Sequence, residues 1–582
     1  MISPALVFTE NEQIGRIAGV DTSRVAIDVT NSEMLTRIGI GQLIAIKGAT
    51  QAEFLIGMTD RVTRSLREEL PSIEENDLGM LTVSPFDHMQ AFIIGTYRTV
   101  DGNNSNVFKR GADSFPQIDR DCFVIEGGNL QRFMGILGAG LPEEEKLKLG
   151  SFVADRNAEA IANGDRFFQR HAAILGSTGS GKSWAVALIL ERAAKLKYPN
   201  IVVFDMHGEY SPLADKTNGG YAQRYRIAGP ADISAPKEDA LFLPYWLLNR
   251  DEMLSMILDR SDQNAPNQAS RFTLHVRDLK GSTLDASNKT KVKETFTVDS
   301  PIPYNISDLL SRLIKDNTSK GIGKNGAPIK GDWEDKLTRF ISRLEAKLGD
   351  RRYGFMFSPP PVALDYGWLA QQIVKLLRAD TGKGIKIIDF SEVPADVLPV
   401  VTGTLARLLY DVQFWMNGDT RTPITLLCDE AHLYLPVKDD ADTIQRQALW
   451  SFERIAKEGR KYGFSLLVVS QRPSDVSRTI LSQCNNFLAL RLTNDNDQSV
   501  IKRLMPDSLV GLTSMLPLLD TGEALILGDA VLLPTRIKLD QPQVKPNSAT
   551  RDFWKEWGSL MPKKELIEAA VECLRGQSRT NV

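Results

Sequence analysis

The sequence predicts an α/β fold in which helices cover both faces of a parallel sheet, with an N-terminal β-barrel and a helical insertion. From about residue 165, fully apolar segments such as "HAAILG" and "NIVVFDMHGEY" alternate with helical periodicity, a pattern typical of a parallel sheet buried on both faces. Residues 13 to 100 instead alternate short apolar stretches with turn residues. Between about 240 and 370, apolar residues recur at helical spacing.

The composition is that of an ordinary globular protein, and its length indicates several domains. The chain has 582 residues, of which 42% are hydrophobic and 25% charged, and a single core stops growing well below this size. The 70 basic and 73 acidic residues give a net charge of −3. Any contact with nucleic acid must therefore use a local basic surface.

Cysteine spacing and hydropathy indicate the compartment. The four cysteines lie far apart, without CxxC or His-flanked spacing, which favours a reducing environment. The first residues lack the basic and apolar regions of a signal peptide, and no apolar run approaches the length of a membrane span. We expect a cytoplasmic protein that does not bind membranes.

The N-terminal strands have the features of a small closed or sandwiched sheet. The segments "IGRIAGV", "RVAIDV", "GQLIAIKG", "EFLIGMT" and "QAFIIGTYRTV" are rich in β-branched residues and glycine. We expect a small antiparallel barrel or sandwich here, and assign residues 1–160 to this domain and its connector.

The first chemical motif is the loop in "HAAILGSTGSGKS", which matches G-x-x-x-x-G-K-[ST] between an apolar strand and an apolar helix. In such a loop the backbone N–H groups turn toward phosphates, the lysine reaches the β and γ oxygens, and the Ser183 hydroxyl binds Mg²⁺. The motif predicts a RecA-like P-loop ATPase core with ATP and Mg²⁺ as cofactors. The expected nucleotide contacts are Gly176, Ser177, Thr178, Gly179, Ser180, Gly181, Lys182, Ser183 and Trp184.

The second motif is "ITLLCDEAH", an apolar strand that ends in Asp429 and Glu430. In P-loop ATPases an aspartate here holds Mg²⁺, and a following glutamate polarises the water that attacks the γ-phosphate. An isolated apolar string ending in Asp-Glu is common, so the prediction depends on its occurrence together with the P-loop. The glutamate favours a hydrolysing motor over phosphate transfer to a small molecule.

Two polar positions complete the predicted catalytic set. Gln471 ends the apolar strand in "FSLLVVSQRP", where a polar residue senses the γ-phosphate in motors of this kind; the alternative is a simple polar cap of the strand. Arg460 lies in "RIAKEGRKYG". It is either one of several cations that stabilise a helix C-terminus or an arginine finger supplied to a neighbouring subunit.

A further acidic segment follows the strand in "IVVFDMHGEY". Asp205 and Glu209 are expected beside the phosphates, where they could orient water or Mg²⁺. His207 has no accompanying ligand cluster, so we do not expect it to bind a metal.

The remaining segments divide the core. Within the insertion, "KDNTSKGIGKNGAPIKGDW" is a basic glycine-rich loop, for which a solvated surface and a contact with DNA are equally open. The tail contains an amphipathic helix that packs on a neighbour or on its own domain. The expected boundaries are 161–240 and 371–540 for the two parts of the core, 241–370 for the insertion and 541–582 for the tail.

Taken in order, "RHAAILGSTGSGKS", "VVFDMHGEY", "LLCDEAH" and "EGRKYGFSLLVVSQRP" resemble the HerA branch of the HerA/FtsK superfamily of hexameric DNA-pumping ATPases. The resemblance covers most of the chain and implies that the N-terminal part is a HAS barrel. It implies that Arg460 acts across the subunit interface and that Arg170 contributes to the site. Asp205 and Glu209 match the family's acidic "DPHGEY" segment, with Met206 in place of proline.

The function expected from this resemblance is a ring-forming, ATP-driven translocase or helicase acting on double-stranded DNA through the pore of a homo-hexamer. HerA relatives work with nucleases or, in anti-phage defence, with effectors such as sirtuin-like NADases. The chain has no second catalytic constellation, so a separately encoded effector is expected. The alternatives are a protein-remodelling ATPase and an ATP-responsive hexameric scaffold that activates a partner.

Overall fold

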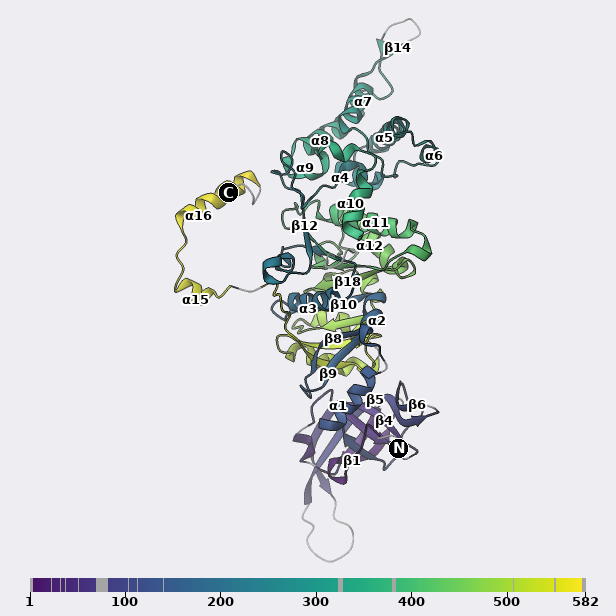
Figure 1. The fold of residues 1–582 in the computed structure, drawn as a ribbon, viewed down its shortest axis with the longest axis vertical. Helices are drawn as coiled ribbons and strands as arrows, with labels where there is room; N and C mark the ends of the chain where they lie inside the picture. Colours follow the sequence, from purple (N-terminus) through teal and green to yellow (C-terminus); the bar gives the residue numbers. More distant parts are fainter. Residues whose placement is uncertain are drawn as a thin grey trace, which may run out of the picture. The chain divides into compact units, whose positions relative to one another are not determined.

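The computed structural model describes residues 4–577 apart from 22–23, 32, 37, 51, 70–81, 103, 113, 140, 323–327, 379–383, 506 and 549–550. The chain divides into two compact units (Figure 1). One comprises Met1–Arg192, Gln471–Ser474 and Cys484–Gln543, and the other Ala193–Ser470, Asp475–Gln483 and Val544–Val582. We name them the P-loop unit and the Asp-Glu unit after the motifs they contain.

Strands of the N-terminal segment close into a barrel within the P-loop unit. Their bounds are β1 Gln13–Val20, β2 Arg24–Val29, β3 Leu43–Lys47, β4 Glu53–Glu69, β5 Thr82–Asp101, β6 Asn104–Arg110 and β7 Asp121–Val124. Among the described residues, six strands follow the order β2-β1-β7-β3-β4-β5, and an antiparallel β2–β5 pairing closes the ring. β6 adds to β5 outside the ring. The predicted N-terminal barrel is confirmed.

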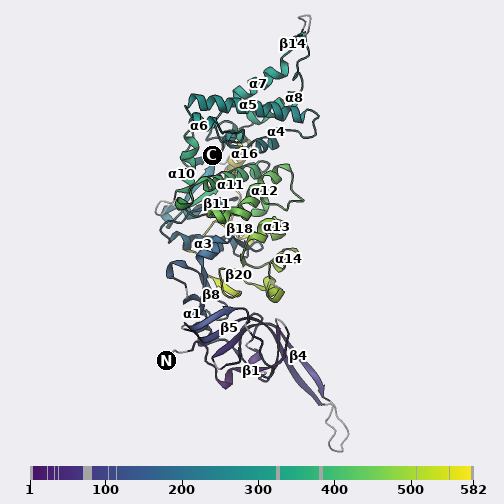
Figure 2. The ribbon, with the colours of Figure 1, turned by 90° about the vertical axis from the view of Figure 1, so that its right-hand side faces the viewer.

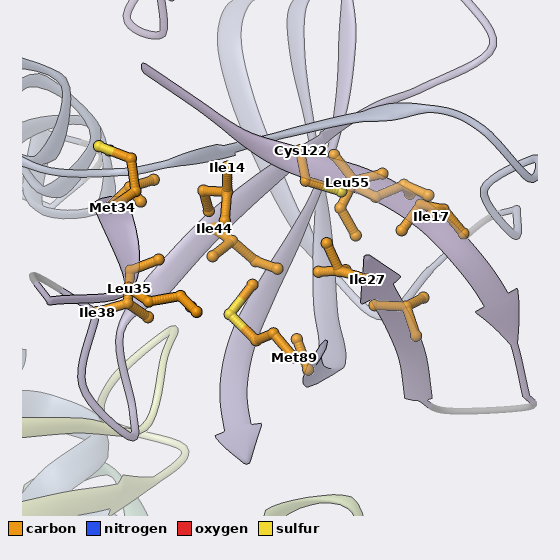
Figure 3. Close-up of a cluster of buried hydrophobic side chains, with 14 residues drawn as sticks. Ile14, Ile17, Ile27, Met34, Leu35, Ile38, Ile44, Leu55, Met89 and Cys122 are labelled. Atoms are coloured by element: carbon orange, nitrogen blue, oxygen red, sulfur yellow. The ribbon is translucent and has the colours of Figure 1, made fainter. Parts of the chain in front are cut away.

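The barrel is filled by apolar side chains that alternate along its strands (Figure 3). Ile14, Ile27, Ile44, Leu55 and Met89 are all 0% exposed. Because successive side chains of a strand point to opposite faces, this alternation directs one apolar set inward. Each such side chain contributes about 1.5–3 kcal/mol by its burial.

Two of the barrel strands continue beyond the ring as a ribbon. The β4–β5 pairing runs from Glu53↔Arg98 to Glu69↔Thr82, and Figure 2 shows both strands leaving the barrel together. Arg64, Ser65 and Leu66 on the ribbon are exposed. The ribbon therefore presents backbone and side chains that the barrel core does not cover.

A second sheet of the P-loop unit holds the phosphate loop. Its strands are β8 Lys146–Phe152, β9 Glu159–Asn163, β10 Ala172–Leu175, β19 Asn486–Ala489, β20 Glu523–Gly528 and β21 Thr535–Leu539. Their order is β10-β19-β20-β21-β8-β9, in which β10–β19 is parallel and the other pairings are antiparallel. The sheet of this unit is therefore mixed, and residues expected to form a connector supply β8 and β9. The helices of this unit are α1 Gly127–Ala139, α2 Gly164–Gln169 and α14 Asp495–Leu504, with α3 Lys182–Ala194 following the loop.

The Asp-Glu unit contains a parallel sheet. Its strands are β11 Ile201–Asp205, β12 Gln223–Ile227, β13 Ala240–Leu241, β16 Ile385–Asp389, β17 Ile424–Cys428 and β18 Phe464–Ser470. They follow the order β13-β12-β16-β11-β17-β18 with every pairing parallel. Every residue of β11, β16, β17 and β18 is buried, as their apolar sequences predicted. Helices α11 Leu398–Trp415, α12 Thr443–Glu458 and α13 Arg478–Gln483 accompany the sheet.

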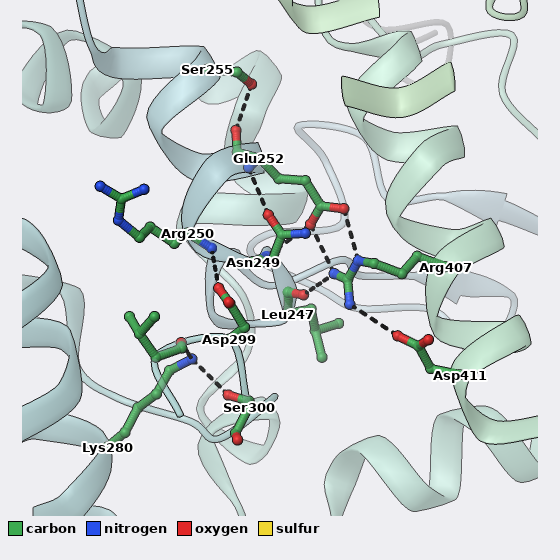
Figure 4. A network of polar contacts seen from close by, with 11 residues as sticks. Leu247, Asn249, Arg250, Glu252, Ser255, Lys280, Asp299, Ser300, Arg407 and Asp411 are labelled. Carbon is green, nitrogen blue, oxygen red and sulfur yellow. Dashed lines mark hydrogen bonds and ion pairs between the residues drawn. The ribbon is translucent and has the colours of Figure 1, made fainter. Parts of the chain in front are cut away.

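The predicted insertion is helical. It contains α4 Arg250–Ile257, α5 Ala265–Ala286, α6 Thr290–Lys293, α7 Ile306–Thr318, α8 Thr338–Gly349, α9 Gly354–Phe357 and α10 Trp368–Leu377. A buried ion pair joins it to α11, because Arg407 donates to both carboxylate oxygens of Glu252 at 2.8 Å (Figure 4). The basic loop after α7 forms a short antiparallel pair, β14 Gly321–Ile322 with β15 Pro328–Ile329. Lys324 lies outside the described residues.

The tail forms α15 Phe553–Trp557 and α16 Lys564–Gly576, neither of which has a buried residue. Within the part of the chain that the structure describes, no helix combines the length and the apolar character needed to span a membrane.

Candidate nucleotide site

The P-loop joins β10 to α3, as predicted, and its glycines are required by its backbone. Gly179 and Gly181 have φ values of 73° and 104°, in a region that other residues rarely adopt. A Cβ on Gly176 would lie 2.6 Å from Ser180 Oγ and 2.8 Å from Leu490 Cβ. Larger residues at these three positions would distort the loop.

Neighbouring loops of the same unit hold the P-loop in place. Ser177 N donates to Arg491 O at 2.8 Å, and Gly522 N donates to Ser180 O at 3.0 Å. Lys182 is 8% exposed and donates from Nζ to Ser177 O at 3.2 Å. Ser180 Oγ is buried without a hydrogen-bond partner among the described residues. An unpaired hydroxyl and a lysine held inside the loop fit a phosphate ligand.

Gln471 is brought to the P-loop, as its proposed sensor role requires. The Thr178 hydroxyl donates to Gln471 Oε1 at 2.6 Å, although the two residues are 293 positions apart in the sequence. The side-chain amide is therefore linked to the phosphate loop in this structure.

The predicted acidic residues of the Asp-Glu unit meet at the carboxyl ends of two adjacent parallel strands. Phe204 of β11 is in register with Cys428 of β17, and Asp429 N donates to Phe204 O at 3.2 Å. Asp205 is 0% exposed and Asp429 is 4% exposed. Two buried carboxylates are thus placed side by side by strand register alone.

The acidic neighbours make the charged forms of these carboxyls costly. Burial raises the pKa of Asp429 well above its usual value, and the charges of Glu430, Asp205 and Glu209 add to the shift. Burial also raises the pKa of Asp205 to about 6, with a further contribution from Asp389. A divalent cation would offset this repulsion. The acidic side chains therefore suit a bound Mg²⁺ with Asp429 as its predicted ligand.

Glu430 has an unusual backbone conformation, with φ 44° and ψ 46°. A non-glycine residue in the left-handed region costs about 1–3 kcal/mol and is concentrated at functional sites. The side chain is 9% exposed, and its Oε2 lies 3.3 Å from His432 Nδ1. Glu430 is therefore held in one orientation after β17.

Asp205 has a structural task that the sequence prediction missed. Its carboxylate accepts hydrogen bonds from the backbone N–H groups of His207, Glu209 and Tyr210 at 3.3, 3.0 and 2.9 Å. The aspartate thereby shapes the turn after β11, a common use of Asp at such turns. His207 is exposed, and no cluster of three or more His, Cys, Asp and Glu side chains arranged to hold a metal ion occurs among the described residues.

Arg460 and Asp429 lie at opposite ends of the strands of their sheet. It precedes β18, whose first residue pairs with Ile424 at the start of β17, whereas Asp429 follows the end of β17. At ~3.3 Å per residue, a strand of this length separates them by roughly 16 Å. Within the described residues the exposed Arg460 side chain has no ion-pair or hydrogen-bond partner. Arg460 is thus not placed beside the Asp-Glu pair of its own chain.

Arg170 is likewise separated from the P-loop of its own chain. It precedes the amino end of β10, whereas the P-loop follows the carboxyl end. Its guanidinium is ion-paired with Asp529, and Asn485 N donates to its carbonyl oxygen at 3.1 Å. A contribution to catalysis stays a prediction, and the described contacts are those of a structural residue.

Sequence reasoning missed two residues of the acidic region. Asp389 ends β16 beside β11 and is ion-paired with Arg224 at 2.6 Å. The sequence feature that could have indicated it is the apolar run of β16, which ends in this aspartate as β11 ends in Asp205. Tyr210 is 0% exposed. No sequence feature indicated a role for it, because an aromatic residue after a buried strand is usually a core residue.

A P-loop between a buried strand and a helix, together with a buried Asp-Glu pair after a parallel strand, defines a P-loop ATPase, the class that uses ATP with Mg²⁺. Residues 147–409 match the family described as "Helicase HerA, central domain". A probable helicase of Methanocaldococcus jannaschii is 26% identical over 460 residues, 78% of each chain. The DNA double-strand break repair helicase HerA of Sulfolobus acidocaldarius is 28% identical over 407 residues, 69% of this chain and 71% of that one. This chain is therefore a P-loop ATPase whose sequence is similar to those of HerA helicases.

Among solved structures, VirB4 of Thermoanaerobacter pseudethanolicus is similar with a TM-score of 0.45 at 16% identity, over 69% of this chain and 97% of that one.

Proposed function

We propose that this protein is a ring-forming ATPase that uses ATP hydrolysis to translocate along, or unwind, double-stranded DNA. The observation that carries the proposal is the buried Asp429 and Glu430 pair after β17, in a chain whose curated relatives are described as HerA helicases. Asp-Glu at this position serves hydrolysis rather than phosphate transfer.

The residues divide the chemistry among them. Lys182 binds the β and γ phosphates, Ser183 and Asp429 hold Mg²⁺, and Glu430 orients the attacking water. Mg²⁺ supplies charge neutralisation at the phosphates. Gln471, whose side chain is hydrogen-bonded to Thr178 of the P-loop at 2.6 Å, senses the γ-phosphate.

Arg460 completes the site of a neighbouring subunit. Its position at the amino edge of β18 and its lack of a side-chain partner among the described residues support action in trans. A guanidinium is suited to this task because it stays charged and presents a rigid fork. A homo-oligomeric ring, which we expect to be a hexamer, supplies the required interface.

DNA binding must use local basic surfaces, since the net charge of the chain is −3. Lys315, Lys320 and Lys330 near the β14–β15 hairpin are exposed, and we propose them as one contact with DNA in the ring pore.

We propose that a separately encoded nuclease or NADase-type effector docks on the barrel, as in DNA processing or anti-phage defence. The barrel supports this proposal because ATP chemistry does not require it. Deleting residues 1–126, which contain the barrel strands and leave β8 and β9 in the sheet of the P-loop, should leave nucleotide binding intact and abolish capture of the product of the adjacent gene. Undiminished capture by the remaining ring would place the docking surface elsewhere.

The experiment that tests the proposed function is ATP turnover with and without double-stranded DNA. We expect double-stranded DNA to raise the rate of ATP turnover, as for a translocase, and Lys182→Ala to abolish this DNA-stimulated turnover. Turnover that is indifferent to DNA would favour a protein-remodelling ATPase, and a negligible rate that rises only with an effector would favour the scaffold.

A further inference from the structure

Tyr210 occupies an enclosed position beside the acidic residues of the Asp-Glu unit. It lies in the turn after β11, is 0% exposed, and donates its backbone N–H to Asp205 Oδ2 at 2.9 Å. The hydrogen bond that shapes the turn therefore also fixes the backbone position from which the Tyr210 side chain extends.

Tyr210 is hydrogen-bonded to Asp205 at the carboxyl end of β11, the strand that pairs with β17 just before Asp429 and Glu430. Burial raises the pKa of Tyr210 well above its usual value, and the charges of Asp429, Asp205, Glu209 and Glu430 add to the shift in that order. The phenol is accordingly neutral and able to donate a proton in a hydrogen bond.

This hydroxyl has no hydrogen-bond partner among the residues that the structure describes. Tyr434 provides a contrast in the same unit, because it is also 0% exposed but its hydroxyl donates to Asp429 O at 3.1 Å. Leaving a buried hydroxyl unpaired is unfavourable. Phenylalanine would fill the same space without that cost, so packing alone does not account for a tyrosine here.

We propose that Tyr210 is a positioning residue whose hydroxyl donates a hydrogen bond to a water molecule bound by Asp429 or Glu430. The inference rests on the proposed ATPase function and deepens it. A water in this place accepts from the phenol and donates to a carboxylate, so the unpaired hydroxyl and the acidic group satisfy each other. No bond to Tyr210 is made or broken in the reaction.

Tyr210→Phe removes the hydroxyl and nothing else. We expect kcat for ATP hydrolysis to fall about tenfold, the effect of one hydrogen bond that is stronger in the transition state, with KM for ATP within about twofold of wild type. The thermal midpoint should stay within about 3 °C of wild type, since phenylalanine fills the same space and only one hydrogen bond to water is lost. The matched control is Tyr225→Phe on β12, which is 5% exposed and whose pKa is raised by burial alone; it should keep wild-type turnover.

A Mg²⁺ titration of turnover separates two forms of the same inference. If the water belongs to the Mg²⁺ shell, Tyr210→Phe needs more Mg²⁺ for half-maximal turnover; if it is the attacking water, the loss of kcat persists unchanged at saturating Mg²⁺. Wild-type kcat in Tyr210→Phe, or a loss of kcat accompanied by a fall in thermal midpoint of more than about 3 °C, would overturn the inference. If the Lys182→Ala variant instead hydrolyses ATP at the wild-type rate, the proposed ATP site is overturned, and the inference with it.

Discussion

Lys182 and Glu430 act at different steps, so their removal should separate nucleotide binding from hydrolysis. We expect Lys182→Ala to lose productive ATP binding because its ammonium contacts phosphate in the ground state. Glu430→Gln should retain binding and lose at least about 100-fold in turnover, because the carboxylate acts mainly in the transition state. Binding of a fluorescent ATP analogue and steady-state turnover measure the two effects. Equal turnover in wild type and Glu430→Gln would refute the role of this carboxylate.

At the residue scale, the sequence was sufficient where spacing encodes chemistry. The run from Gly176 to Ser183 has a fixed spacing with a known backbone requirement, and the structure places its glycines at positive φ or in close contact. The use of Asp205 as a cap for three backbone N–H groups could not be predicted, because it depends on how the turn after β11 folds back. Tyr210 became visible only when its burial and missing partner were known.

The helical insertion carries a buried lysine whose ionisation should affect stability. Lys280 is 1% exposed and donates to Val298 O and Ser300 O, both at 2.7 Å (Figure 4). Burial lowers its pKa to about 7. The unfolded chain therefore binds the extra proton between pH 7 and about 10, and the contribution of Lys280 to stability rises with pH across this window.

We expect the thermal midpoint of wild type minus that of Lys280→Met to increase from pH 7 to pH 9, as measured by circular dichroism. A difference that is constant with pH would show that Lys280 ionises in the folded protein as it does in water.

The hairpin after α7 is the element on which DNA contact can be tested. Replacing exposed Lys315, Lys320 and Lys330 by alanine should weaken DNA binding and reduce the slope of log K against log salt by up to roughly 3, since each phosphate contact contributes ~0.9. The charge-preserving arginine variant is the control. An unchanged slope in the alanine variant would identify the loop as a solvated surface.

At the element scale, predictions succeeded for the strands of the barrel and for strands buried on both faces, and failed where strands pair at a distance in the sequence. The apolar runs of β11, β17 and β18 were recognised because parallel buried strands have continuous apolar sequences. The sequence predicts a connector at β8 and β9, because the pairing that brings this hairpin into the sheet joins β8 to β21, which is distant in the sequence. The extension of β4 and β5 beyond the barrel is likewise a pairing that apolar alternation does not signal.

The whole molecule must be an oligomer if Arg460 acts in trans. We expect Arg460→Ala and Lys182→Ala to be inactive alone, and mixed rings to recover part of the ATPase activity, because some interfaces then combine an intact P-loop with an intact arginine. Turnover is measured across mixing ratios, with Lys461→Ala as the control for a neighbouring cation. No recovery at any ratio would remove the main support for the trans site.

The central claim is that ATP hydrolysis moves this protein along DNA, and triplex displacement tests it most directly. A third strand bound to duplex DNA is released only when a motor travels through its position. We predict release by wild type with ATP and Mg²⁺, and none by Glu430→Gln or with a nonhydrolysable analogue. Robust ATP turnover without release by wild type, under conditions in which the protein binds the duplex, would contradict the account.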